Sequence, residues 1–236
     1  MTNPTPPLPA RQALLERLAG TILRLTVAGV TLVAIDGVDG AGKSVFGDEL
    51  ARLLAAAGRP VIRASVDSFH NPKALRYRRG RLSPEGFFRD SYDYGQLRAV
   101  LLDPLSPGGD GRYRTAVFDH RSDAPVSVPE AQAQVGDILV FDGIFLHRPE
   151  LRSYWDFSIF LQVEEAVSVR RCAQRDGGSP DLFAPENRRY VEGQRLYLRE
   201  CEPQRHASVV IDNNDIAAPY LIRASLPLWD GSGGDL

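Results

Sequence analysis

A glycine-rich segment with one lysine and one serine, Gly37–Ser44, carries the residue types of a phosphate-binding site. Its sequence GVDGAGKS fulfils the pattern G-x-x-x-x-G-K-[ST], in which glycines let backbone N–H groups turn toward a phosphate. Lys43 can reach the outer phosphates of a nucleotide, and the Ser44 hydroxyl can hold a magnesium ion. The segment predicts a nucleotide site made of Gly37, Asp39, Gly40, Ala41, Gly42, Lys43, Ser44 and Val45.

Two aspartates follow apolar segments that are typical of buried strands, Asp67 after residues 61–66 and Asp142 after residues 138–141. Ligands of parallel α/β sheets gather at the carboxyl ends of the strands, so both carboxylates should face the phosphate loop. We expect the strand before Asp67 to neighbour the strand of that loop, which makes Asp67 a candidate for accepting a proton from an attacking hydroxyl. Asp142 suits a magnesium role through bound water, and the predicted metal residues are Ser44, Asp67 and Asp142. The alternative for either aspartate is a cap on a strand or helix.

Arginines gather in two segments. Arg170, Arg171 and Arg175 lie on or just after a predicted helix, before the glycine-rich loop 176–180. Phosphoryl transfer gains from cations that arrive when a loop closes and excludes water, so Arg171 and Arg175 are candidate catalytic residues. The alternative is a solvated helix face. The segment 71–92 is predicted to be irregular, and its arginines fit either a solvated loop or an anion-attracting surface.

The segment Tyr113–Arg121 mixes aromatic, histidine and arginine side chains. Such side chains can stack on a flat ring and hydrogen-bond to it, although a lone histidine such as His120 is more often structural. The segment is therefore a candidate for binding a ring-shaped substrate. The other histidines, His70, His147 and His206, are not at metal-ligand spacing, and we assign no metal to them.

Apolar segments alternate with segments of helical periodicity along the chain, which predicts an α/β fold with a parallel sheet and helices on both faces. Predicted strands cover residues 31–35, 61–66, 138–141, 157–163 and 208–211, and residues 112–118 form a strand of a small lid or flap. Predicted helices cover residues 11–27, 45–57, 94–102, 164–175 and 186–201. We expect one P-loop domain over residues 11–230, a disordered lead at 1–10 and a disordered tail at 231–236.

The composition of the 236-residue chain limits its partners and its compartment. A formal net charge of −2 gives no case for nucleic-acid binding, and no apolar run is long enough to span a membrane. The two cysteines, Cys172 and Cys201, lack metal-ligand spacing, which indicates a reduced setting. We therefore expect a cytoplasmic protein that binds a small molecule. The sequence does not determine whether the protein forms a homo-oligomer.

Four segments together resemble the uridine kinase group of P-loop kinases, which also includes phosphoribulokinase and bacterial pantothenate kinase. These segments are IDGVDGAGKS, VDSFH, ILVFDGIFL and VRRCAQRD, and the resemblance covers residues 31–213. In uridine kinases the aspartate after the second strand is the catalytic base, which falls on Asp67. The chain departs from the group at His70, where tyrosine is usual, and at Asp142, where glutamate is usual.

The resemblance also implies residues that bind the phosphoryl acceptor. Uridine kinases hold the ribose hydroxyls with an aspartate in the next loop, for which Asp90 and Asp93 are both candidates. Their base-binding tyrosine, phenylalanine and histidine are matched here only loosely, with altered spacing. The substrate-binding residues expected on this basis are Asp90, Asp93, Tyr113, Phe118, His120 and Arg121.

The function predicted from these features is ATP-dependent transfer of the γ-phosphoryl group to a primary hydroxyl, with Mg²⁺ as cofactor. The catalytic residues would be Lys43, Asp67, Arg171 and Arg175. The resemblance implies the 5′-hydroxyl of uridine or cytidine as acceptor. A kinase of another small alcohol (pantothenate, a sugar phosphate or another nucleoside) is the first alternative, and a non-catalytic ATP-binding regulator is the second. A GTP switch is disfavoured, because the guanine-reading motif Asn-Lys-x-Asp is absent.

Overall fold

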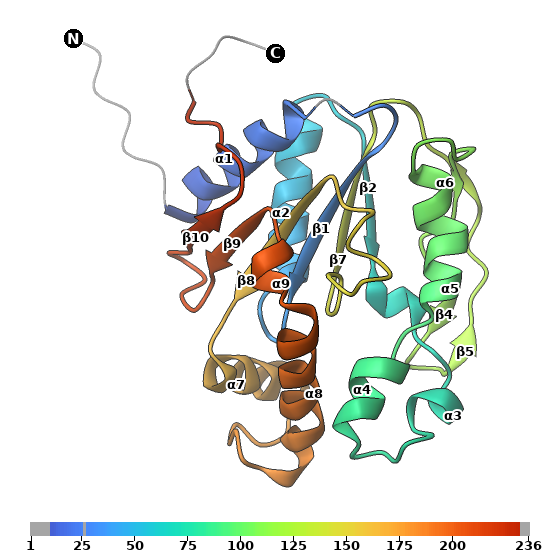
Figure 1. Cartoon of the computed structure of the whole chain (residues 1–236), viewed down its shortest axis with the longest axis vertical. Helices are drawn as coiled ribbons and strands as arrows, with labels where there is room; N and C mark the ends of the chain where they lie inside the picture. Colours follow the sequence, from blue (N-terminus) through green and yellow to red (C-terminus); the bar gives the residue numbers. More distant parts are fainter. Residues whose placement is uncertain (1–9, 26, 232–236) are drawn as a thin grey trace.

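A six-stranded, mostly parallel sheet forms the centre of the computed structural model, which describes residues 10–25 and 27–231 (Figure 1). The strand order is β10-β9-β8-β1-β7-β2, and β10 pairs antiparallel with β9 at one edge. The strands are β1 (Thr31–Gly37), β2 (Val61–Ser65), β7 (Ile138–Gly143), β8 (Phe157–Gln162), β9 (Val209–Asp212) and β10 (Tyr220–Ala224).

The two central strands are apolar over most of their length because both faces of the sheet are covered. Every residue of β1 and of β7 is buried. A strand that is buried on both faces needs a continuous apolar run rather than alternation with polar residues. The two strands run in parallel with Ile35 opposite Asp142, so their carboxyl ends reach the same edge of the sheet.

Helices cover both faces of this sheet. On one face, α1 (Ala10–Leu23) and α2 (Lys43–Ala56) pack with Val33 and Ile35 of β1. On the other face, Leu32 and Ala34 of β1 belong to a core that includes side chains of α4 (Pro84–Asp90), α5 (Tyr94–Leu97), α6 (Asp103–Leu105) and α8 (Pro185–Cys201). The alternation along β1 follows from the two-residue period of a strand. The predicted α/β architecture is confirmed.

Strand β7 lies between β1 and β2, so the prediction that the strand before Asp67 neighbours the phosphate-loop strand is wrong. β1 pairs with β7 on one side and with β8 on the other. Strand order depends on crossover connections between distant segments, and a local apolar pattern does not contain it. The edge strand β10 was also not predicted, because its exposed and half-buried residues give no continuous apolar run.

The segment predicted to be irregular, residues 71–92, holds two short helices, α3 (Lys73–Arg76) and α4. Ser83 caps α4, since its hydroxyl accepts a hydrogen bond of 3.0 Å from the backbone N–H of Gly86. The predicted helix 94–102 is longer, because α5 continues through a π-helical segment (Arg98–Leu102) into α6.

The predicted strand 112–118 is two separate short strands. β3 (Arg112–Tyr113) pairs with β6 (Ala131–Gln132), and β4 (Phe118–Asp119) pairs with β5 (Ala124–Pro125). The helices α3, α4, α7 (Glu165–Asp176) and the start of α8 lie beyond the carboxyl ends of the parallel strands, in the lower part of Figure 1. A short helix, α9 (Pro203–His206), leads from α8 into β9.

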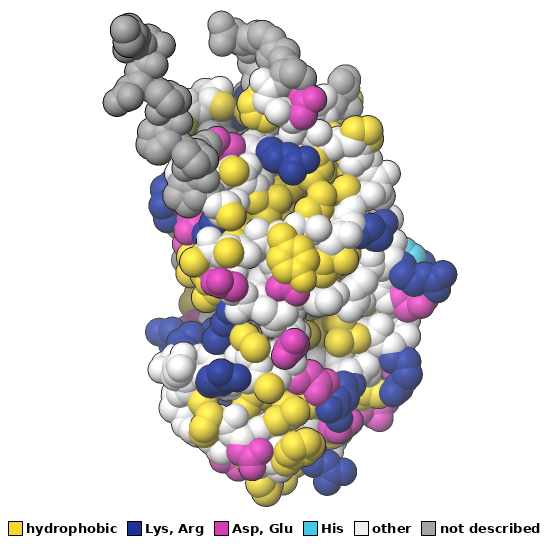
Figure 2. Space-filling view, turned by 90° about the vertical axis from the view of Figure 1, so that its left-hand side faces the viewer, with side chains coloured by type: hydrophobic (Ala, Val, Ile, Leu, Met, Phe, Trp, Pro, Cys, Tyr) yellow, Lys and Arg dark blue, Asp and Glu magenta, His cyan; other side chains and the backbone are white. Residues whose placement is uncertain are grey.

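The C-terminal segment packs on the first helix. The backbone N–H of Trp229 donates a hydrogen bond of 2.9 Å to Thr21, and the Arg24 guanidinium lies 4.7 Å from the Trp229 ring. The predicted lead and tail lie outside the described residues, except for Ala10, which begins α1, and Gly231. Basic and acidic side chains are mixed over the face shown in Figure 2. In the described part of the chain, no helix is both long and apolar enough to cross a membrane.

Candidate active site

The phosphate loop between β1 and α2 has a backbone that requires glycine. Gly40 and Gly42 have φ angles of 69° and 87°, in the left-handed region that other residues rarely adopt. A Cβ atom on Gly40 would lie 2.5 Å from the carbonyl oxygen of Ser168. Val45, in the first turn of α2, is exposed. The loop therefore has the conformation in which backbone N–H groups at a helix N-terminus can bind a phosphate.

Contacts from α7 and from the end of β9 hold this loop in place. The Ser168 hydroxyl donates a hydrogen bond of 2.6 Å to the carbonyl oxygen of Asp39, and the Asn213 amide donates one of 2.7 Å to that of Ala41. Arg171 donates to the carbonyl oxygen of Gly40 at 3.3 Å, and to those of Asn213 and Asn214. The Arg171 guanidinium is thus engaged in fixing the loop rather than open to a ligand.

Ser44 and Asp142, two of the three residues expected to hold Mg²⁺, are in contact, whereas Asp67 lines the pocket described below. The Ser44 hydroxyl donates a hydrogen bond of 2.7 Å to Asp142, whose other carboxylate oxygen accepts one of 2.9 Å from Arg63 of β2. Lys43 donates to the carbonyl oxygen of Val38 at 2.8 Å, across the loop. Within residues 10–25 and 27–231, no group of three or more His, Cys, Asp or Glu residues could hold a metal. A hydroxyl and one carboxylate fit Mg²⁺, which is usually bound through few protein groups together with water and substrate phosphates.

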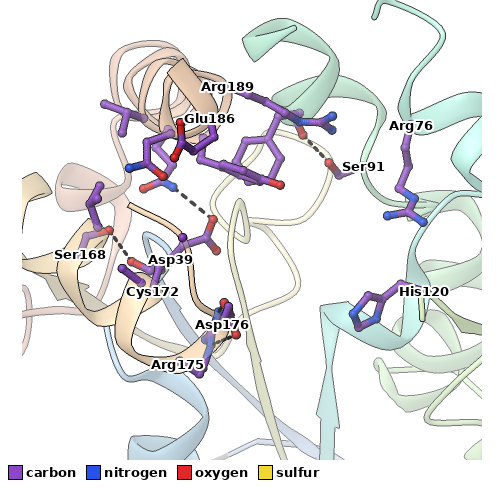
Figure 3. A pocket seen from close by; sticks show the side chains of 18 of the residues that line it. Asp39, Arg76, Ser91, His120, Ser168, Cys172, Arg175, Asp176, Glu186 and Arg189 are labelled. Atoms are coloured by element: carbon purple, nitrogen blue, oxygen red, sulfur yellow. Dashed lines mark hydrogen bonds and ion pairs between the residues drawn. The ribbon is translucent and has the colours of Figure 1, made fainter. Parts of the chain in front are cut away.

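A pocket of about 580 Å³ opens beside the loop (Figure 3). One side, the loop wall, is formed by Asp39 of the phosphate loop and by Ser168, Cys172 and Arg175 of α7. The other side, the opposite wall, is formed by Asp67, Arg76, Tyr77, His120 and Arg189. In Figure 3, Asp39, Ser168 and Cys172 lie across the pocket from Arg76 and His120, and Arg189 extends from α8.

Asp67 stands at the start of a short 3₁₀-helix, Val66–Phe69, that follows β2. The Ser65 hydroxyl caps this turn by accepting a hydrogen bond of 3.4 Å from the backbone N–H of Asp67. The Asp67 side chain is exposed to the pocket, and one of its oxygens accepts a hydrogen bond of 3.3 Å from the Tyr92 hydroxyl. Its second oxygen accepts no hydrogen bond from the described residues, so it can serve a ligand hydroxyl.

Burial shifts the proton affinity of several groups around the pocket. Burial raises the pKa of Asp39, against the effect of Lys43, and the nearby charge of Asp67 adds to the rise. Burial lowers the pKa of His70, which stays neutral at neutral pH. Burial also raises the pKa of Cys172 to about 11, so this thiol stays protonated. Asp39 and Asp67 thus face one pocket from its two sides, and their negative charges repel each other.

Most of the predicted substrate-binding residues are placed elsewhere. Asp90 is buried and accepts hydrogen bonds from Arg78 and Arg79 at 2.6 Å and 2.8 Å, and Asp93 caps α5 through the backbone N–H of Gln96. Among the residues expected to bind the acceptor, His120 lines the pocket, whereas the following are absent from its lining: Asp90, Asp93, Tyr113, Phe118 and Arg121.

The two predicted lid arginines differ in position. Arg175 lines the pocket and pairs with the neighbouring Asp176 at 2.7 Å, with 67% of its side chain exposed. An exposed side chain at the end of a helix can swing toward a bound phosphate at small cost. Arg171 is instead half-buried and bonded to three carbonyl oxygens, as described above.

Other pocket residues were missed by the sequence analysis. Arg189 lies in a helix that was predicted, but nothing in its local pattern separates it from the exposed Arg188 beside it. Gln194, five positions further along α8, donates a hydrogen bond of 3.2 Å to Asp39. Arg76 was noted only as one of several arginines in the segment 71–92. The position of α8 over the phosphate loop is a tertiary feature, and no local signal indicated it.

Family comparison agrees with this geometry. The family model described as phosphoribulokinase/uridine kinase matches residues 32–179, more than half of the chain and including the phosphate loop, Asp67 and Asp142. The chain belongs to this family. A search of the curated proteins finds no match to it.

Solved structures of kinases share the fold. A possible uridine kinase from Bacillus stearothermophilus is 24% identical with a TM-score of 0.68, covering 85% of this chain and 97% of that one. A structure provisionally assigned to a fructose transport system kinase from Silicibacter sp. TM1040 is 27% identical with a TM-score of 0.61, covering 80% and 92%. A D-glycerate 3-kinase from Cryptococcus neoformans var. grubii is 12% identical with a TM-score of 0.54, covering 90% and 97%. The P-loop kinase fold is thus shown.

Proposed function

We propose that the chain is an ATP-dependent kinase that transfers the γ-phosphoryl group to a primary hydroxyl of a small molecule. Membership in a kinase family supports phosphotransferase activity in general. The observation that carries the proposal for this chain is the shared pocket: Asp67 and the phosphate-loop residue Asp39 line it from two sides. A carboxylate open to a ligand at that place suits the proton acceptor that the reaction needs.

The side chains divide the reaction between them. The phosphate loop and Lys43 bind the donor phosphates, and Mg²⁺ bound near Ser44 and Asp142 would neutralise charge on the phosphate oxygens. Asp67 orients the acceptor hydroxyl and takes its proton as the oxygen attacks the γ-phosphorus. The bond to the β-phosphate oxygen breaks, and ADP leaves. Arg175 approaches the transferred group when the loop after α7 closes, which excludes water.

The acceptor implied by the family resemblance is uridine or cytidine, phosphorylated at the 5′-hydroxyl. The rings of His70 and His120 lie 4.8 Å apart beside the pocket, and His70 lies 4.5 Å from Tyr92, so these rings offer a surface for a flat base. Other small alcohols are the alternative acceptors. A similar solved structure is provisionally assigned to a fructose transport system kinase, which agrees with this alternative. We also propose a cytoplasmic location, which both free cysteines support.

A non-catalytic ATP-binding regulator is the rival from another class. Such a protein has no need of an exposed carboxylate across from the phosphate loop, and Asp67 therefore argues for an enzyme. The test is ATP turnover measured with a panel of nucleosides and other alcohols, with each phosphorylated product identified by mass spectrometry. We expect at least one alcohol to be phosphorylated and to stimulate ADP release. Binding of ATP without stimulation by any alcohol would support the regulator.

A further inference from the structure

Two buried arginines of the pocket have polar atoms without partners. Arg76 is 8% exposed and Arg189 is 6% exposed, and both line the pocket. The Nε–H group of each is buried and donates to no acceptor among the described residues. A buried N–H group that loses its water without gaining an acceptor destabilises the protein. A ligand that pairs with the two guanidinium groups would offset that cost.

The charge of Arg189 is not neutralised within the described part of the chain. No carboxylate there lies within 4 Å of it, and its hydrogen bond of 2.6 Å goes to the carbonyl oxygen of Arg81. Burial lowers the pKa of Arg189, and the nearby cations Arg76 and Arg81 lower it further. Buried cations are normally paired, because an isolated buried charge is strongly unfavourable.

Three guanidinium groups surround one aromatic ring on this wall. The guanidinium carbons of Arg189, Arg81 and Arg76 lie 4.7, 5.3 and 5.6 Å from the centre of the Tyr77 ring. Among the described residues, the Asp123 carboxylate forms an ion pair with the Arg76 guanidinium at 3.1 Å. Cation–π contacts with Tyr77 offset part of the repulsion. The cluster still carries more positive than negative charge beside the pocket.

This cluster is separate from the groups that serve the ATP phosphates. The cations that lower the pKa of Asp39 in the phosphate loop, against the effect of its burial, are Lys43 and Arg175, and neither belongs to this cluster. The groups around Arg189 are Tyr190, Tyr77, Arg76 and Arg81. The loop wall therefore has its own cations for the donor, and those of the opposite wall are available to the acceptor.

We propose that Arg189 and Arg76 form an oxyanion subsite, so that the preferred acceptor carries a phosphate or carboxylate group in addition to the hydroxyl that is phosphorylated. The inference rests on the proposed kinase function and narrows its substrate class. The bound oxyanion would pair with the guanidinium groups of Arg189 and Arg76, which line the pocket, and neutralise the Arg189 charge. Guanidinium groups suit both phosphate and carboxylate, because their N–H donors match the spacing of two oxygens.

The experiment uses the full chain and pairs of acceptors that differ by one oxyanion. The pairs are uridine and uridine 3′-monophosphate, fructose and fructose 6-phosphate, and glycerol and glycerate, each of which keeps a free primary hydroxyl. Turnover of ATP is measured with every compound. Binding of every compound to the ADP-saturated protein is measured by calorimetry, which does not depend on catalysis. One charge-assisted hydrogen-bond pair predicts about tenfold to hundredfold tighter binding of the anionic member.

Each outcome supports or overturns the subsite, the kinase function, or both. Tighter binding and faster turnover of an anionic member support both, and the pair concerned tells phosphate from carboxylate. Neutral members that bind and react at least as well as their anionic partners overturn the subsite and leave the kinase function standing. Tight binding of an anionic member without any phosphoryl transfer supports the subsite and contradicts the kinase. Absence of any preference in binding, with no turnover, overturns both.

Matched variants locate the subsite. Arg189→Met removes the buried charge, and Arg188→Met removes an exposed charge from the next position of α8. We expect Arg189→Met to raise the KM of the anionic acceptor by about tenfold or more, with the KM of ATP unchanged, while Arg188→Met alters neither. A rise in the KM of ATP alone would assign Arg189 to the donor and overturn the subsite. If Arg189→Met does not fold, the binding comparison on the unaltered chain decides the proposal.

Discussion

The two walls of the pocket are built in different ways. On the loop wall, Ser168 of α7 and Asn213, which follows β9, donate hydrogen bonds directly to the backbone of the phosphate loop, at Asp39 and Ala41. On the opposite wall, Arg76 and Arg189 contact the Tyr77 ring, and each makes one polar contact, Arg76 with Asp123 and Arg189 with the carbonyl oxygen of Arg81. Their Nε atoms have no partners in the described structure. A rigid loop suits a donor phosphate that always has the same shape. A wall with unpartnered donors suits a ligand that completes it and thereby sets specificity.

The largest effect is expected at Asp67, the carboxylate of the opposite wall. Asp67→Asn keeps the size of the side chain and loses its basicity, so acceptor-dependent turnover should fall by about 10² to 10⁴. The variant should also be assayed over a range of Mg²⁺ concentrations. Rescue at high Mg²⁺ would assign Asp67 to the metal, and lack of rescue would assign it to the proton. Asp110→Asn, at an exposed turn, is the control and should retain activity.

Removing the lysine of the phosphate loop should act on the donor. Lys43→Ala is expected to lower turnover by about 10² to 10³, the usual cost of losing one electrostatic donor. Among the described residues the Lys43 side chain makes one hydrogen bond, to the carbonyl oxygen of Val38, so circular dichroism and the melting temperature should change little. Arg17→Ala, an exposed cation of α1, is the matched control. An unfolded Lys43→Ala protein would show that the lysine is structural.

A smaller effect is expected at the rim of the loop wall. Arg175→Ala should lower turnover by about tenfold without weakening ATP binding, because its exposed side chain contributes only when the pocket closes. Arg170→Ala, an exposed position of the same helix that does not line the pocket, should behave like the unaltered protein. Loss of ATP affinity with normal turnover would contradict a lid role for Arg175.

The smallest effect on activity is expected at Asp90, which is buried and is absent from the pocket lining. Burial opposes ionisation, but hydrogen bonds from Arg78 and Arg79 outweigh it and hold the pKa of Asp90 below its ordinary value. A lowered pKa gives stability that is present above the ordinary pKa and is lost as the pH falls through the folded value. Asp90→Asn should therefore lower the free energy of unfolding by about 2 kcal/mol at neutral pH.

The difference in stability between Asp90→Asn and the unaltered chain should shrink in acid, below the ordinary pKa of 3.8. Denaturant unfolding at several pH values measures it. If Asp90 is structural, the KM of the acceptor stays the same in this variant. A large rise in that KM with unchanged stability would restore Asp90 as the ribose-binding residue that the family resemblance implies.

The sequence predicted the loop wall better than the opposite wall for physical reasons. The glycines, Lys43 and Ser44 act within one turn of chain, so their spacing alone indicates a phosphate cradle. Asp67 and Asp142 follow apolar runs that could be assigned to strands, although the order of those strands could not. Arg76 and Arg189 are 113 positions apart in the sequence. They come together only in the folded chain, where both contact the Tyr77 ring. No local pattern distinguishes them from the many exposed arginines of the chain.

The division between the two walls is tested most directly by measuring ATP binding and acceptor-dependent turnover on the same preparation of Asp67→Asn. We predict that the dissociation constant of ATP is unchanged within error while turnover falls. The donor would then be bound by the loop wall alone, with Asp67 acting on the acceptor. A parallel loss of ATP affinity, or near-normal turnover with every acceptor tested, would contradict the assignment of Asp67 to the transfer step.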